Sequence, residues 1–261
     1  MLTPTLLPKL KELRLSGILE TLERRAEEAQ SADLSPVEFL ALLLDDEVER
    51  RHQSRQGRLE REAGFEVPKR LTQFDFSVVP TLNKREVLEM ATCAFVAEHL
   101  NWLVAGPTGT GKSHLVSAIG YEAIRKGYRV LSVSTHRLLG DLYAARADGS
   151  YLRRLGRLVA ADLLILDDFG LRPMSGTGAE DLYEIIQRRY EKGSILLTSN
   201  RSPSEWADWF NDPLLASAAL DRLTHHARIT TITGESYRQR QRKKEGTLIS
   251  EREPSIKTST G

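Results

Sequence analysis

Hydrophobic positions follow two different periods along the chain, and the change between them divides it into two parts. In residues 5–62, leucine, isoleucine and valine recur every three or four positions with charged residues between them, which is the period of an amphipathic helix. From Leu71 onward, short apolar runs alternate with helical stretches. The pattern predicts a small all-helical N-terminal domain over residues 1–70 and an α/β domain over residues 71–240.

The N-terminal part contains a sequence signal for the start of a helix. Ser35 precedes Pro36, and Glu38 follows the serine by three positions, so the two polar side chains can cap each other's backbone N–H groups. We therefore expect a helix to begin at Pro36, to continue toward Arg58 and to end at Gly64.

The α/β part contains five short, almost continuously apolar runs, which predict strands. Strands without alternation are buried on both faces, and strands that alternate with helices form parallel sheets. The sequence thus predicts a three-layer sandwich, in which helices cover both faces of a five-stranded parallel sheet. The runs are residues 102–105, 130–133, 163–166, 195–198 and 229–232.

Composition narrows the class of protein. The chain has 261 residues, 40% hydrophobic and 28% charged, which suits a globular protein with one sizeable core. The longest apolar run, residues 39–44, is too short to cross a bilayer, and the N-terminus has no signal pattern, so we expect a cytoplasmic protein without a membrane partner. The single cysteine, Cys93, excludes an intrachain disulfide, and we interpret it as a core residue within a helix.

The first candidate functional motif is the octet of residues 106–113, which lies between the first predicted strand and a predicted helix. It matches the GxxxxGK[ST] phosphate-binding loop, whose glycines let successive N–H groups face one anion at a helix N-terminus. Lys112 would reach the β- and γ-phosphates of the nucleotide, and the Ser113 hydroxyl would bind Mg²⁺. The predicted nucleotide contacts are Gly106, Pro107, Thr108, Gly109, Thr110, Gly111, Lys112, Ser113 and His114.

Polar side chains follow two further strands. Asp167 and Asp168 end the third strand, where Asp167 would hold the metal through water and Asp168 would orient or deprotonate the attacking water. Asn200 ends the fourth strand and would hold that water or the γ-phosphate. Aspartate and asparagine are also common turn residues after strands. The assignment of catalytic roles to these residues therefore rests on the presence of the phosphate loop in the same chain.

Arg222 lies on a predicted helix before the last strand. It could complete a neighbouring subunit's site as an arginine finger, whereas in isolation it reads as a solvated helix arginine. An arginine supplied in trans predicts a self-assembling enzyme that hydrolyses ATP to ADP and phosphate. The predicted catalytic residues are Lys112, Asp167, Asp168, Asn200 and Arg222.

Six segments occur in a characteristic order: 74–76, 106–113, 164–169, 198–200 with 204–206, 220–226 and 234–238. Together they resemble the IstB family of AAA+ ATPases, the transposition helper proteins of bacterial insertion sequences, which are related to the DnaC helicase loaders. The resemblance implies a P-loop AAA+ fold, self-assembly on duplex DNA with ATP, and action on a partner transposase. By position it makes Asn200 the sensor-1 residue and Arg222 the arginine finger.

The chain departs from the general AAA+ pattern in two places. Asp168 stands where glutamate is usual and is one methylene shorter; a misplacement of about 1 Å can cost about 100-fold in rate, which suggests a slow ATP timer rather than a motor. Too few residues follow Gly234 for a helical lid domain, which leaves Arg238 as a candidate sensor-2 arginine. Residues 241–261 are polar and basic, and we expect this tail to be disordered.

A local excess of arginine marks the candidate DNA surface. The formal net charge is only +1, but residues 135–160 contain five arginines against two aspartates. Phosphate neutralisation by such a stripe gives salt-sensitive binding with little sequence preference, and related initiator and loader ATPases carry a DNA-facing helical element here. A solvated helix face is the alternative. The arginines are Arg137, Arg146, Arg153, Arg154 and Arg157.

The leading interpretation is an ATP-dependent DNA-binding transposition helper that oligomerises on duplex DNA and recruits or stimulates its transposase. A DnaC-like helicase loader is the alternative, and a monomeric P-loop kinase, indifferent to Arg222, is a third. The N-terminal domain is the predicted partner-binding element. The pair His225 and His226 has no metal-ligand company in the sequence, and we interpret it as packing at a helix end.

Overall fold

The computed structural model describes residues 6–174, 176–234 and 236–237, in which the chain forms two compact units that meet in sequence between Arg61 and Glu62. Arg238 and the tail 241–261 lie outside the described residues. Within the described part, no helix combines membrane-spanning length with a sufficiently apolar surface.

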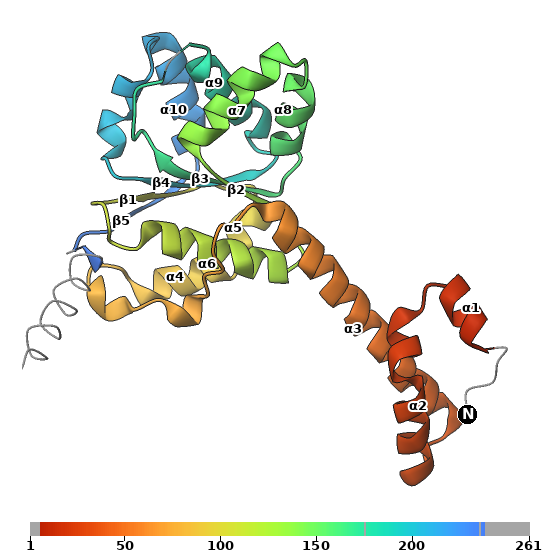
Figure 1. The fold of residues 1–261 in the computed structure, drawn as a ribbon. Coiled ribbons are helices and arrows are strands. Elements are labelled where there is room, and N and C mark those ends of the chain that lie inside the picture. Colours follow the sequence, from red (N-terminus) through yellow and green to blue (C-terminus); the bar gives the residue numbers. More distant parts are fainter. Residues whose placement is uncertain (1–5, 175, 235, 238–261) are drawn as a thin grey trace, which may run out of the picture. The chain divides into compact units, whose positions relative to one another are not determined.

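The N-terminal unit consists of helices, as the period of its apolar residues predicts (Figure 1). They are α1 (Leu6–Glu12), α2 (Ser16–Ser31) and α3 (Pro36–Ala63). The predicted cap of α3 is present, because Ser35 N donates to Glu38 Oε2 at 2.8 Å and Glu38 N donates to Ser35 Oγ at 3.3 Å. Leu10, Ile18, Leu22 and Leu43 form the core of this unit.

The C-terminal unit is built on a five-stranded parallel sheet with strand order β2-β3-β4-β1-β5, which confirms the predicted fold class. Each strand lies within a few residues of its predicted run. The third extends further, to Phe169, through a register shift after Leu166. The strands are β1 (Trp102–Ala105), β2 (Val130–Ser134), β3 (Leu163–Phe169), β4 (Ser194–Ser199) and β5 (Arg228–Thr231).

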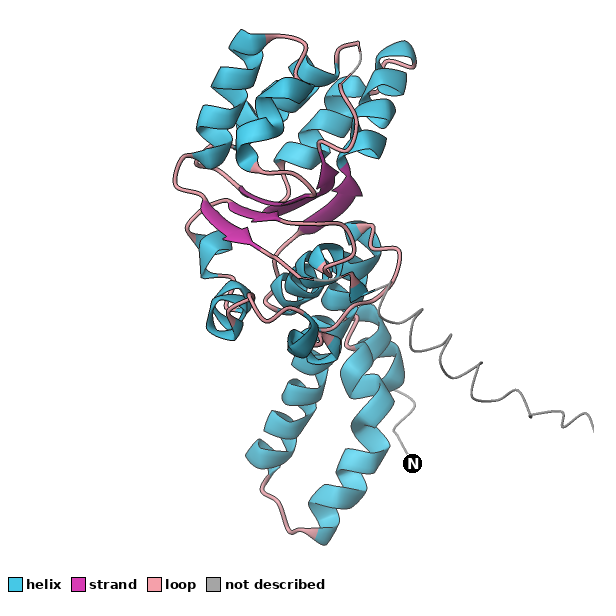
Figure 2. Cartoon of the chain, turned by 90° about the vertical axis from the view of Figure 1, so that its left-hand side faces the viewer, coloured by secondary structure: helices cyan, strands magenta, loops and turns pink. Residues whose placement is uncertain are grey.

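Helices cover both faces of this sheet. Figures 1 and 2 show α7–α10 on one face and α4–α6 on the other, so the strands are shielded from water on both sides. The helices are α4 (Lys84–Ala91), α5 (Ala94–Ala97), α6 (Lys112–Arg125), α7 (Thr135–Ala147), α8 (Tyr151–Val159), α9 (Gly178–Arg189) and α10 (Pro213–Thr224). Short 3₁₀ turns are η1 (Leu71–Gln73), η2 (Phe76–Val78) and η3 (Pro203–Trp209).

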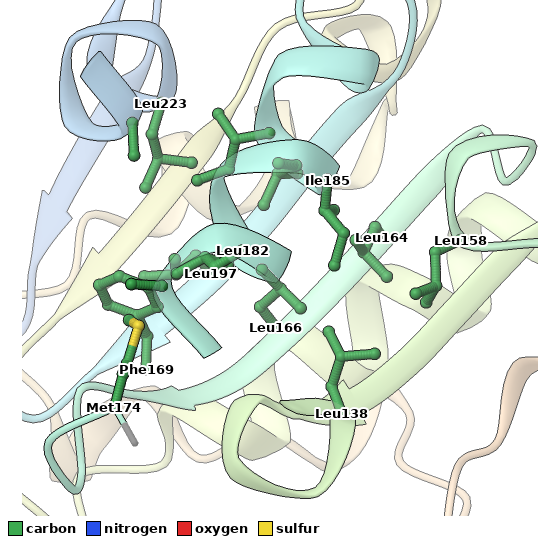
Figure 3. Packing of buried hydrophobic residues seen from close by; sticks show 14 of the residues in the cluster. Leu138, Leu158, Leu164, Leu166, Phe169, Met174, Leu182, Ile185, Leu197 and Leu223 are labelled. Carbon is green, nitrogen blue, oxygen red and sulfur yellow. The ribbon is translucent and has the colours of Figure 1, made fainter. Parts of the chain in front are cut away.

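Apolar side chains of the strands form the main core with the helices above them. Figure 3 shows Leu164, Leu166 and Leu197 from the sheet packed near Leu182 and Ile185 of α9. All five are almost completely buried, so burial of this apolar surface stabilises the sandwich and fixes the ends of the strands.

Two tryptophans and the single cysteine also belong to the core. Trp206 and Trp209 are core residues, and each packs edge-on against Phe169, with ring centroids 5.1 and 5.5 Å away. Cys93 is buried, and burial raises the pKa of its thiol to about 11. The prediction that it lies within a helix is wrong: with a φ of 56° it is the left-handed residue between α4 and α5.

Candidate functional site

The phosphate loop connects the buried end of β1 to the first turn of α6. Gly111 caps α6 with a φ of 90°, a left-handed conformation that costs glycine little. At Gly106 a Cβ atom would lie 2.1 Å from the carbonyl oxygen of Ile232, so only glycine fits. This backbone turns the N–H groups that open α6 toward one pocket, where an anion is favoured.

The loop lysine is held inside the curve of the loop. Lys112 is only 5% exposed, and its Nζ donates to the carbonyl oxygens of Gly106 and Pro107, each at 2.8 Å. Thr110 Oγ1 donates to the same Pro107 oxygen at 2.9 Å, which tightens the turn. The ammonium therefore lies where it can meet phosphate oxygens bound in the loop.

The fold brings Ser113 and Asp167 together from separate elements. Ser113 Oγ, in the first turn of α6, donates to Asp167 Oδ1 near the end of β3 at 3.0 Å. A hydroxyl and a carboxylate oxygen are ligands that Mg²⁺ accepts beside nucleotide phosphates and water. The pair therefore fits the metal expected with a nucleoside triphosphate.

Thr198 is a site residue that sequence reasoning missed. Its hydroxyl donates to Asp167 Oδ1 and accepts from Asp168 N, the latter at 3.0 Å, so one buried side chain positions both carboxylate residues. The available signal was a hydroxyl in an otherwise apolar run, directly before the polar end of β4. A buried hydroxyl requires partners, and the neighbouring strand supplies them.

Asp168 and Asn200 complete the polar edge of the sheet. Asp168 adopts a φ of 54° at the register shift in β3, and such irregularities re-aim side chains next to active sites. Asn200 directly follows β4, which lies between β1 and β3 in the sheet. Both residues line the same pocket as the phosphate loop.

This pocket has a volume of about 1310 Å³ and extends beyond the predicted contacts. Phe74 and His114 form an edge-on ring pair with centroids 5.5 Å apart beside the loop. Tyr237 N donates to the carbonyl oxygen of Gly109 at 2.9 Å, which holds this late segment against the loop. Phe74 and Tyr237 belong to segments that carried the family resemblance, but the sequence did not assign them to the site.

Arg222 does not join this site. It lies in the last turn of α10, which leads to the start of β5, whereas the phosphate loop follows the end of the parallel strand β1. Its Nη1 donates to Ala218 O at 2.9 Å, and its guanidinium lies 5.7 Å from the ring centre of Tyr183. Arg222 therefore lies at the opposite end of the strands from the phosphate loop of its own chain.

The five predicted DNA-binding arginines do not form one group. Arg137 on α7 and Arg154 and Arg157 on α8 line the large pocket, and Arg153 is exposed on α8. Arg146 instead pairs with a buried carboxylate on α9. Four of the five are thus available to a polyanion.

Comparison with known proteins gives one consistent family. The family model described as IstB-like ATP binding protein matches residues 8–245. The chain is also 39% identical over 249 residues to the ATP-binding protein of insertion sequence IS21 from Pseudomonas aeruginosa, a match that covers 95% of this chain and 93% of that protein.

Solved structures support the fold. DnaI superposes with a TM-score of 0.55 at 23% identity, covering 63% of this chain and 91% of that one. AMPPCP-bound DnaA from Aquifex aeolicus gives 0.54 at 23% identity, covering 74% and 59% respectively. These similarities confirm the predicted P-loop AAA+ fold.

Proposed function

The chain belongs to the IstB-like ATP-binding proteins, and we propose that it is the ATP-dependent helper of an insertion sequence, which oligomerises on duplex DNA and recruits or stimulates its transposase. The observation that carries the proposal is the contact of Ser113 with Asp167 beside the phosphate loop, because it brings together two side chains that Mg²⁺ accepts as ligands in a member of this family. We expect the protein to act in the cytoplasm.

ATP hydrolysis follows from the placement of the polar side chains. Lys112 and the N–H groups at the start of α6 would bind the phosphates, and Ser113 and Asp167 would hold Mg²⁺, which when bound neutralises charge on the phosphate oxygens. Asp168 accepts a proton from the attacking water, and Asn200 orients that water or the γ-phosphate. Thr198 keeps both aspartates in position through its hydroxyl.

Completion of the site requires a second subunit. Arg222 lies at the edge of the sheet opposite its own phosphate loop, so a neighbouring chain would receive its guanidinium. An arginine finger contributes about 10³-fold or more in turnover, and coupling turnover to assembly lets ATP control the length of time an oligomer stays on DNA. Asp168 in place of glutamate fits such a timer.

The DNA contacts assigned to this helper are electrostatic. Arg137, Arg153, Arg154 and Arg157 gather cationic groups on α7 and α8 without a base-reading motif. Binding to duplex DNA should therefore weaken steeply with salt and depend little on sequence.

An exposed apolar stripe supports transposase binding by the N-terminal unit. Val37, Leu40, Leu44 and Val48 recur along one side of α3, and all four are exposed. Leu44→Glu in the full chain should abolish transposase stimulation while leaving DNA-dependent ATP turnover intact. Leu88→Glu, at an exposed leucine of α4, is the matched control and should leave both activities unchanged.

Steady-state ATP turnover tests the central proposal. Turnover per chain should rise with long duplex DNA and with protein concentration. Arg222→Ala and Lys112→Ala chains should each be inactive, whereas a mixture of the two should regain activity, because one supplies the phosphate loop and the other the arginine. Turnover proportional to protein and indifferent to DNA, or an inactive mixture, contradicts the proposal.

The helicase-loader alternative uses the same ATPase core but a different partner. A pull-down assay separates the two interpretations. The full chain is the bait, and binding of its cognate transposase is compared with binding of a replicative helicase. Capture of the helicase alone would replace the transposition role and leave the nucleotide chemistry unchanged.

A further inference from the structure

The histidine pair at the end of α10 meets a third metal-ligating side chain. Glu191, just after α9, places a carboxylate oxygen beside the rings of His225 and His226, with one ligand atom of each residue within 4.8 Å of the others. The prediction that this pair has no metal-ligand company is wrong. The reason is tertiary: α9 and α10 pack together and end at the same edge of the sheet, so segments distant in sequence meet there.

We propose that Glu191, His225 and His226 bind a divalent transition metal ion of the Zn²⁺ type. Two imidazole nitrogens and one carboxylate oxygen are a donor set that Zn²⁺ uses, commonly with water in a fourth position. All three residues are exposed, so a metal ion and its water can reach them. The hard ion Mg²⁺ prefers oxygen ligands and is disfavoured here.

Two of these residues share an uncommon backbone conformation beyond the ends of α9 and α10. Glu191 and His226 adopt φ values of 58° and 56°, a left-handed conformation that is uncommon for residues other than glycine. Each residue follows the C-terminus of a twelve-residue helix, α9 or α10. Both residues thus lie close in sequence to a helix C-terminus, where partial negative charge favours a cation.

A second layer of contacts supports the ligands. Tyr190 Oη lies 2.6 Å from His225 Nδ1, so a protonated Nδ1 can donate to the phenol oxygen and leave Nε2 for the metal. The rings of His225 and His226 have centroids 3.8 Å apart. These residues line a pocket of about 210 Å³, to which Glu98 and His99 also contribute.

Arg222 lines the same pocket, and its charge has to be accommodated. Its Nη1 donates to Ala218 O, one helical turn earlier, and its guanidinium lies near the Tyr183 ring. The arginine is therefore directed along its own helix, and the pocket lining also includes the carboxylates of Glu191 and Glu98.

Zn²⁺ titration of the full chain without nucleotide, in competition with a fluorescent chelator, tests the proposal. We expect one ion per chain. His226→Asn should weaken Zn²⁺ binding at least ~10-fold, because loss of a residue that only hydrogen-bonds to a metal ligand already has an effect of that size. Asparagine tolerates the left-handed backbone, so this variant should fold. His52→Asn, at an exposed histidine of α3, is the matched control and should bind as the unaltered chain does.

Two further measurements separate this site from the nucleotide site. Asp167→Asn should leave Zn²⁺ binding unchanged, and His226→Asn should retain ATP binding. With bound Co²⁺, the visible spectrum of the unaltered chain should change in His226→Asn but not in Asp167→Asn. Equal Zn²⁺ binding by the unaltered chain and His226→Asn, or no stoichiometric binding by either, overturns the proposal whatever the outcome of the ATPase tests.

Discussion

Arg146 on α7 donates through Nη2 to Oδ1 of Asp181 on α9 at 2.5 Å, and the Asp181 side chain is completely buried. Tyr151 donates its hydroxyl to the same oxygen at 2.8 Å, and burial, followed by this carboxylate, raises the pKa of Tyr151 to about 12. One buried charge thus connects α7, α8 and α9. Arg146 is held in this network, which separates it from the other arginines of the candidate DNA surface.

Arg146→Ala should therefore affect stability, and Arg153→Ala should affect DNA binding. Loss of Arg146 leaves Asp181 buried with only neutral partners, so we expect the free energy of unfolding to fall by roughly 2–3 kcal/mol. Arg153→Ala should change the free energy of unfolding by less than about 0.5 kcal/mol. It should lower the slope of log affinity for DNA against log salt concentration by about 1, which corresponds to the loss of one phosphate contact. Denaturant unfolding and DNA titrations at several salt concentrations measure both; equal stability of the two variants would contradict this assignment.

Thr198→Val should impair catalysis without impairing the fold. Valine keeps the shape of threonine but removes the hydroxyl that donates to Asp167 and accepts from Asp168 N. We expect ATP turnover to fall by about 10- to 100-fold, with a higher Mg²⁺ requirement, as for other partners of metal ligands. Thr198→Ser, which retains the hydroxyl, should keep most of the activity. Similar losses in both variants would mean that packing of the methyl group matters instead.

The backbone at Asp168 gives a physical reason for aspartate at this position. Its φ of 54° is left-handed, a conformation that aspartate and asparagine adopt more readily than glutamate. If the shorter side chain makes hydrolysis slow, Asp168→Glu should raise turnover at saturating ATP and DNA while costing about 1 kcal/mol of stability. Asp168→Asn, which suits the backbone, should bind ATP but not hydrolyse it. Unchanged or lower turnover in the glutamate variant removes the timer explanation.

The fold could be predicted from the sequence because its strongest signals are local. Apolar runs without alternation require cover on both faces, and the glycine-rich octet requires a strand before it and a helix after it. The capping pair Ser35 and Glu38 likewise acts within one turn and is found where predicted. Each of these patterns depends on neighbouring residues only, so no knowledge of tertiary contacts is needed.

The rest of the site depends on contacts between distant segments. Thr198 is one hydroxyl in a strand until β3 lies beside β4 and brings Asp167 to it. Arg146 looks like any surface arginine in a basic stretch until α9 supplies Asp181. Glu191 has no evident role until α9 and α10 end together. Strand order and helix packing decide these encounters, and neither can be read from the spacing of residues.

Arg189 should be irreplaceable by lysine. It is buried, and its guanidinium donates to carbonyl oxygens at the end of α8 and the start of β4, including Ala161 at 2.7 Å and Ser194 at 2.6 Å. Burial lowers the pKa of Arg189 to about 10. Its planar guanidinium carries several N–H donors in a fixed arrangement, which matches these carbonyl acceptors better than the ammonium group of lysine. Arg189→Lys should leave carbonyl groups without donors and cost about 2–4 kcal/mol in denaturant unfolding. A cost below about 1 kcal/mol would mean that water replaces the lost donors.

Stability of the N-terminal unit should depend on pH through Asp46. Arg25 forms a two-pronged contact with this carboxylate, Nε to Oδ2 at 2.9 Å and Nη2 to Oδ1 at 2.7 Å, and these hydrogen bonds hold the pKa of Asp46 far below its ordinary value. A carboxyl group whose folded pKa is lowered contributes stability that is present above its unfolded pKa of about 4 and is lost as the pH falls toward the folded value.

Asp46→Asn should therefore weaken the contact between α2 and α3 at pH 7 but lose less further stability than the unaltered chain as the pH falls below about 4. Helical circular dichroism during urea unfolding, compared at pH 7 and at acid pH, measures the difference. Asp45→Asn, at the neighbouring exposed aspartate of α3, is the matched control. Parallel pH profiles for the unaltered chain and Asp46→Asn would show that other carboxylates govern acid unfolding of this unit.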